Sequence, residues 1–195
     1  MDRSAYEDEL RNREIKQVTE FEILEKAKEI GADIASKSQL ELSANLKRVV
    51  QTEGISSAIE YCNINAYPLL DSLEKSYDVS IKRVSYRNRN PKNQPDSLEN
   101  ALLESYAYSL KDEISINDNV QKVSQDELLF TRPIIVSSGL CLNCHGNEGN
   151  GMNEEVLNKL DELYPEDKAR NHELGDLRGM WSIRMRTKDV VLSIQ

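Results

Sequence analysis

The chain has 195 residues, of which 38% are hydrophobic and 30% are charged, and its formal net charge is −9. This is the composition of one globular domain, or of one domain with a helical extension. Because binding to phosphates requires a basic surface, the acidic balance argues against nucleic acid as a partner. No stretch approaches the roughly 20 apolar residues that a membrane-spanning helix needs.

Residues 1–52 predict an N-terminal helical segment. Apolar residues recur at helical spacing from Leu10 and Ile15 to Ile34, and the pattern resumes at Leu42. The segment is one long helix, or two helices with a break near residues 36–38. It either packs on the body of the protein or forms a homodimer with a second copy.

Residues 53–195 predict the main domain, which begins with a second helix. Ser57 and Glu60 are spaced as a capping box, and Pro68 should kink or shorten this helix. Cys62 lies within the apolar stripe and should therefore face the interior. The stripe consists of Ile55, Ala58, Ile59, Cys62, Ala66, Leu69, Leu70 and Leu73.

The middle of the chain reads as short strands around one helix. Residues 79–82 alternate as a strand, and residues 83–95 form an ordered loop rich in asparagine and arginine. A helix follows over 97–110. Residues 114–123 suggest a hairpin with its turn at 117–119, and residues 128–136 suggest a buried strand.

This strand leads into Cys141-Leu142-Asn143-Cys144-His145. The spacing C-x-x-C-H is the attachment sequence of a c-type haem. Each thiol can add to one haem vinyl group, and the imidazole of His145 can bind the iron. The chain has only three cysteines and two histidines, so three of these five residues fall within one pentapeptide.

Paired cysteines also occur in redox dithiols and zinc sites. A thioredoxin-like pair requires a βαβ context, which this region lacks. A structural zinc site normally uses two such pairs, and only Cys62 and His172 remain to complete one. The motif therefore indicates haem c, with zinc or a plain dithiol as the alternatives.

The motif also bears on location. Thioether attachment of haem takes place on the outer face of the bacterial inner membrane, so we expect a periplasmic or otherwise exported protein. No signal peptide is visible, but an export signal that had been removed would leave no trace.

The remainder of the chain predicts a loop, a helix and strands. Residues 147–151 read as a flexible loop, and Asn153 can cap a helix that ends before Pro165. Residues 181–186 alternate as a strand, and residues 190–192 read as its partner.

Several separated motifs together resemble a bacterial family of single-haem c-type domains with a PAS-like core, formerly a domain of unknown function and of the haem-based sensor type. The resemblance covers residues 40–194. It implies an α+β fold, with a five-stranded antiparallel sheet flanked by helices and the haem held against the sheet. It also implies a sensing or redox role. The motifs are Ala58-Ile59-Glu60-Tyr61-Cys62, Arg83-Val84-Ser85, Arg89-Asn90-Pro91, Arg132-Pro133-Ile134, the segment 141–146, and Gly175-Asp176-Leu177-Arg178-Gly179.

The second axial position of the iron has several candidate ligands. Cys62 lies on an inward helical face and matches the family's cysteine, so we expect it to bind the iron opposite His145. The alternative is that Cys62 is a small core residue. His172 lies in a charged stretch and should be exposed to solvent. The methionine candidates are Met152, Met180 and Met185, of which Met180 is the first choice. The remaining alternative is that no residue occupies this position.

The two haem propionates need cations in an acidic protein. Arg87 and Arg89 in the asparagine-rich loop, and Arg178 before the final strand, are the candidates. The alternative is that they are ordinary surface arginines.

Three functions are compatible with a single haem. A redox or diatomic-gas sensor would use loss of the Cys62 ligand as its switch. A periplasmic electron-transfer cytochrome c would keep its ligands and meet a redox partner. An enzyme such as a peroxidase would need a distal acid–base residue, and the only spare histidine is His172, so we expect no enzymatic activity.

Overall fold

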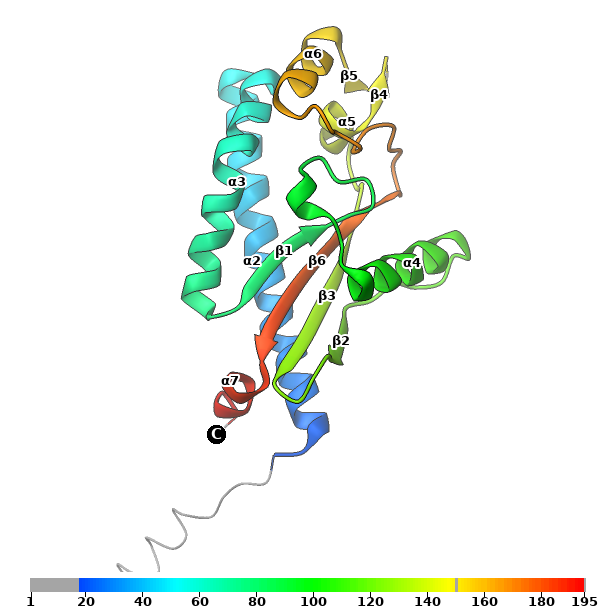
Figure 1. Ribbon diagram of the computed structural model, residues 1–195. Helices are drawn as coiled ribbons and strands as arrows, with labels where there is room; N and C mark the ends of the chain where they lie inside the picture. Colours follow the sequence, from blue (N-terminus) through cyan, green and yellow to red (C-terminus); the bar gives the residue numbers. More distant parts are fainter. Residues whose placement is uncertain (1–17, 150, 195) are drawn as a thin grey trace, which may run out of the picture.

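The computed structural model describes residues 18–149 and 151–194, with the side chains of Ala66 and Tyr67 left out (Figure 1). Two long helices, α2 (Glu20–Glu53) and α3 (Ile55–Tyr77), precede the sheet. No helix in these residues is long and apolar enough to cross a membrane. The remaining elements are β1 (Ser80–Val84), η1 (Pro91–Asn93), α4 (Ser97–Lys111), β2 (Asn119–Lys122), β3 (Glu127–Ile135), α5 (Gly139–His145), β4 (Asn147–Glu148), β5 (Gly151–Met152), α6 (Glu154–Leu163), β6 (Leu177–Arg186) and α7 (Thr187–Leu192).

The main sheet is antiparallel, with the strand order β1-β6-β3-β2. Its two central strands, β6 and β3, form the longest ladder, which shifts register between Ile134 and Ile135. The predicted α+β class, the antiparallel sheet and the long N-terminal helix are confirmed. The sheet has four strands in the described residues, where the family resemblance implied five.

Helices cover both faces of this sheet. Trp181 and Ile183 of β6 share a core with Ala27 and Ile34 of α2. On the opposite face, Met180 packs with Leu103 and Tyr106 of α4. Because helices cover both faces, β6 is buried along most of its length. The alternation of buried and exposed residues that its sequence predicted is therefore not seen in the structure.

Helix α2 is continuous through residues 36–38. It begins at a capping box between Thr19 and Glu22, while Leu10 and Ile15 lie outside the described residues. Its buried residues belong to the same apolar cluster as the sheet. Packing on the body of the protein, the first alternative from the sequence, therefore accounts for its apolar face, and the homodimer stays a prediction.

Three local predictions were wrong. Helix α3 begins at Ile55 after Gly54, and Ser57 Oγ donates to the Glu53 carbonyl at 3.1 Å instead of forming a capping box. Strand β2 pairs with β3, not with residues 114–116, which are outside any strand. Residues 190–192 lie in α7, because β1 and β3 already occupy both sides of β6 and leave no edge for a returning strand.

Gly31 marks the closest approach of α2 to the sheet. A Cβ there would lie 2.2 Å from Cγ of Phe130, whose side chain is fully buried. We therefore expect Gly31→Ala to lower the free energy of unfolding by about 1–3 kcal/mol, because the steric cost exceeds the gain in helix propensity. Urea unfolding measures this change. Gly139→Ala is the control, since a Cβ there meets nothing within 4 Å. A Gly31→Ala protein as stable as the original would contradict the close approach.

Candidate functional site

The C-x-x-C-H motif forms the short helix α5, which follows β3 at one end of the sheet (Figure 1). Cys141 and Cys144 are free thiols, each partly exposed. Residues three apart in a helix lie on one face, so both sulfurs face the same direction. The loop predicted at 147–151 contains the short parallel pair β4 and β5, which packs against α5. The motif is thus part of the folded body.

The His145 imidazole is held through one nitrogen. Its Nδ1 lies 2.9 Å from the Ala169 carbonyl oxygen, and because a carbonyl can only accept, Nδ1 must donate. Nε2 then carries a lone pair, and Arg178 Nε approaches it at 3.5 Å. Burial, together with the charges of Arg178 and Arg89, holds the pKa of His145 well below its usual value. The ring is therefore neutral, which is the form that binds a metal.

The segment 167–172 runs beside the motif. The peptide N–H of Asn171 donates to the Gly146 carbonyl at 2.7 Å, and that of His172 donates to the His145 carbonyl at 2.9 Å. These bonds, with the one from the His145 ring to Ala169, fasten α5 to this segment on the histidine side.

The charged neighbours of His172 predicted that it is exposed, and this prediction was wrong. The residue is 1% exposed. Its ring lies edge-on to that of His145, with 6.1 Å between the centroids. Nδ1 is 3.3 Å from Arg87 Nη1 and 3.5 Å from Asp176 Oδ2, while Nε2 has no partner in the described part of the chain. Burial and the charges of Arg87 and Arg178 lower the pKa of His172 to about 4. The charged neighbours suggested an exposed segment. Arg170, however, forms ion pairs with Asp167 and Asp161.

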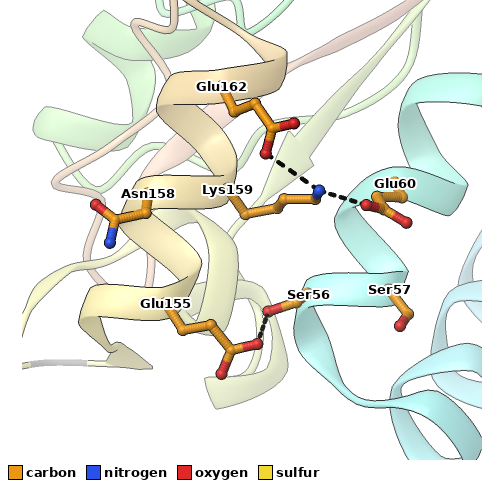
Figure 2. Close-up of a pocket in the computed structure, with 7 residues that line it drawn as sticks. All are labelled: Ser56, Ser57, Glu60, Glu155, Asn158, Lys159 and Glu162. Carbon is orange, nitrogen blue, oxygen red and sulfur yellow. Dashed lines mark hydrogen bonds and ion pairs between the residues drawn. The ribbon is translucent and has the colours of Figure 1, made fainter.

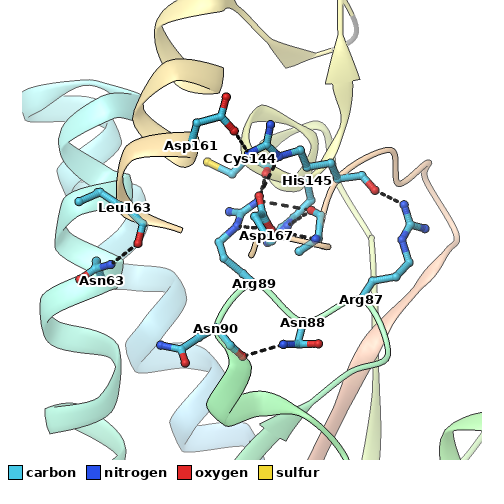
Figure 3. A network of polar contacts seen from close by, with 12 residues as sticks. Asn63, Arg87, Asn88, Arg89, Asn90, Cys144, His145, Asp161, Leu163 and Asp167 are labelled. Carbon is cyan, nitrogen blue, oxygen red and sulfur yellow. Dashed lines mark hydrogen bonds and ion pairs between the residues drawn. The ribbon is translucent and has the colours of Figure 1, made fainter. Parts of the chain in front are cut away.

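The structure brings the three predicted arginines together around the motif. Figure 3 shows two of them, Arg87 and Arg89. Arg89 Nη2 donates to the Cys144 carbonyl at 2.5 Å, and Arg89 Nε donates to Asp167 at 3.2 Å. Arg178 Nη1 donates to the Arg87 carbonyl at 3.0 Å. Burial, and after it the charge of Arg89, lowers the pKa of Arg178 to about 9. The Arg89 side chain is 13% exposed and that of Arg87 is 40% exposed. Such a grouping of cations favours an anionic ligand.

Cys62 is partly buried on the N-terminal half of α3. This half contacts α6, where Ile59 packs against Val156 and Leu160. Burial raises the pKa of the Cys62 thiol, and the charge of Arg83 opposes that rise. Burial also raises the pKa of Cys144 to about 11, and Cys62 contributes to the rise. The two cysteines therefore lie close enough to influence each other.

The methionine candidates differ in their position. Met180 and Met185 belong to the clusters on the two faces of the sheet. Met152 is buried in a small cluster that Cys144 contacts. Among the three, only Met152 packs beside the motif in the described residues.

Polar contacts join α3 to α6 across a shallow hollow of about 320 Å³ (Figure 2). Lys159 lies between Glu60 and Glu162, and its Nζ is 3.2 Å from the Glu162 carboxylate. Ser56 Oγ donates to Glu155 at 2.5 Å. Neither motif cysteine lines this hollow. Within residues 18–149 and 151–194, no group of three or more His, Cys, Asp or Glu side chains is placed to hold a metal ion.

Comparison with known proteins gives one family and one structure. The model of the Tll0287-like family matches residues 12–186. The crystal structure of the cyanobacterial heme-protein Tll0287 matches with a TM-score of 0.52 and 23% identity, covering 64% of this chain and 71% of that one. At this identity the structural match shows the fold alone. No curated protein matches the chain. The family match confirms the resemblance carried by the separated motifs.

Proposed function

The chain belongs to the Tll0287-like family, and from this premise we propose that it binds one haem covalently, as haem c. The structure of similar fold is that of a heme-protein. The observation that carries the proposal is the imidazole of His145, which directly follows two cysteines on one helical face and donates from Nδ1 to a carbonyl. Its Nε2 carries the lone pair that would bind iron, in place of the contact from Arg178 Nε at 3.5 Å. A histidine that binds a metal usually donates its other ring nitrogen in this way.

The surrounding residues fit the chemistry of a haem. Cys141 and Cys144 supply the two thiols for thioether bonds. Arg87, Arg89 and Arg178 supply cations for the two propionates. The buried Nε2 of His172 is a further polar atom, with no hydrogen-bond partner among the described residues. Because Arg87 donates toward Nδ1, Nε2 carries the ring proton and is a donor. An anionic group would satisfy these donors.

We further propose Cys62 as the axial ligand opposite His145. The thiol is partly buried and lies near Cys144, and Arg83 and Arg89 favour its ionised form. Burial opposes ionisation, but coordination to a metal can deprotonate a thiol even in such surroundings. A bound haem supplies one-electron redox chemistry and an iron that can take diatomic ligands.

From this ligand set we propose a redox or diatomic-gas sensor without enzymatic activity, in the periplasm or otherwise exported. The thiolate favours the ferric state, so reduction would weaken its bond to iron. In the sensor, loss of that bond would release the half of α3 that carries Cys62. This half of the helix would then be the element that switches between two states. The alternative is a periplasmic single-haem electron-transfer cytochrome c that acts with a redox partner.

Visible spectra of the ferric and ferrous protein, with and without carbon monoxide, separate these functions. For the sensor, we expect a low-spin ferric spectrum with thiolate and imidazole ligands, a changed ligand set after reduction, and binding of carbon monoxide. An electron carrier would keep the same two ligands in both oxidation states and would not bind the gas.

A further inference from the structure

Asp167 is a buried carboxylate that pairs with Arg89 of the arginine cluster. Its side chain is 1% exposed. Oδ1 accepts from the Ala169 peptide N–H at 2.8 Å and from Arg89 Nε at 3.2 Å, while Oδ2 accepts from Arg170 Nε at 2.9 Å. Burial would raise the pKa of Asp167, but Arg89, Ala169 and Arg170 together lower it. The carboxylate is therefore charged at neutral pH.

The Ala169 peptide connects this carboxylate to the imidazole. Its N–H is held by Asp167, and the Ala169 carbonyl accepts from His145 Nδ1 at 2.9 Å. The same carbonyl lies 3.3 Å from Arg89 Nη2. Arg89 in turn binds the Cys144 carbonyl, one residue before His145. Two short routes thus lead from Asp167 to the axial histidine (Figure 3).

We propose that Asp167 is the positioning residue of His145, fixing the orientation and the basicity of its imidazole through the Ala169 carbonyl and the Arg89 guanidinium. This inference rests on the proposed binding of haem through His145.

The physical basis is a chain of polarised hydrogen bonds. A carboxylate that accepts from the Ala169 N–H strengthens the carbonyl as an acceptor for His145 Nδ1. A stronger bond at Nδ1 makes Nε2 a better donor to iron, and better donation favours the ferric state. The negative charge also offsets that of Arg89. Both effects keep the reduction potential low.

The chain offers a matched control in Asp161. Its carboxylate also accepts from Arg170, at 2.5 Å from Nη2, but it is 66% exposed, and in the described residues no hydrogen bond joins it directly to Ala169 or Arg89. Asp161→Asn and Asp167→Asn therefore remove the same charge beside the same arginine. They differ in burial, and only Asp167→Asn alters the hydrogen bonds that connect through Ala169 to His145.

We expect Asp167→Asn to increase the equilibrium constant for reduction about tenfold, equivalent to ~59 mV for one electron, and Asp161→Asn to leave it within about twofold. Spectroelectrochemistry measures this on the haem-loaded chain. Electron paramagnetic resonance of the ferric form should show altered g-values for Asp167→Asn alone. NMR of the ferrous form should show faster exchange of the His145 Nδ1 proton in that variant, and Asp167→Glu should restore part of the protection.

Equal potentials and equal proton exchange in Asp167→Asn and Asp161→Asn would overturn the positioning role. If Asp167→Asn does not fold, Arg89→Lys replaces it. The ammonium keeps the charge but lacks the planar fork that joins Asp167, through Nε, to the Cys144 and Ala169 carbonyls, through Nη2. An unchanged Nδ1 exchange rate would then refute the proposal. If the unaltered chain carries no haem, the proposed function fails. Exchange at His145 Nδ1 still tests the link to Asp167 in that protein.

Discussion

We expect replacement of both Cys141 and Cys144 by alanine to remove all covalently attached haem from the purified protein, because these are the two thiols that α5 presents on one face. Acid–acetone extraction of the unaltered protein should leave the haem on the polypeptide, and extraction of the double variant should leave none. Each single variant retains one thioether at most. The measurement is the haem absorbance that stays with the precipitated chain.

The control is Cys62→Ala, which should keep its haem through extraction because Cys62 is outside the motif. A second check is expression without a c-type maturation system, where we expect haem-free protein. Extraction of intact haem from the unaltered chain would exclude covalent attachment. Efficient loading without maturation would contradict the proposed export.

We expect Cys62→Ser to change the ferric visible spectrum and to raise the reduction potential by on the order of 100 mV, because the proposed thiolate ligand, a strong donor, would be lost from iron. The residue lies on the half of α3 that packs beside the motif, where Arg83 and Arg89 oppose the effect of burial on its pKa. Spectroelectrochemistry measures both changes.

Met180→Leu is the matched control for a sulfur ligand. Met180 packs with α4 on one face of the sheet, and a change to leucine nearly conserves volume, so spectrum and potential should stay as they were. Met152→Leu tests the methionine that packs beside Cys144. If Cys62→Ser has no effect, Cys62 is a core residue, and the electron-carrier function takes the place of the sensor.

Local patterns in the sequence predicted much of the fold. The apolar spacing of α2, the capping residue Asn153 of α6 and the alternation around Trp181 all correspond to observed elements. The failures concern pairing. Whether residues 190–192 form a strand depends on a free edge beside β6, and edges are set by strands distant in sequence. For the same reason, residues 114–116 read as a strand but have no partner.

At the site, the sequence identified the residues that carry chemistry but not those that hold them. Cys141, Cys144 and His145 are recognisable because their spacing is itself the signal. Asp167 and His172 have no such spacing. Their importance arises from hydrogen bonds to Ala169 and His145, across more than twenty residues in the second case. The acid and arginine run at 167–170 looked like a solvated surface, although a buried ion-pair cluster has the same composition.

Pro68 lies inside α3, six residues after Cys62. A proline has no N–H to donate to the carbonyl four residues earlier, which here is that of Ile64. One backbone hydrogen bond of the helix is therefore missing. The half before this gap packs through Ile59 on α6, and the half after it packs through Leu70 in the sheet core. Helix α3 nevertheless runs unbroken from Ile55 to Tyr77, so Pro68 does not shorten it. The position with the missing hydrogen bond is where bending of the segment that bears Cys62 would cost least, while the apolar contacts of Leu70 stay in place.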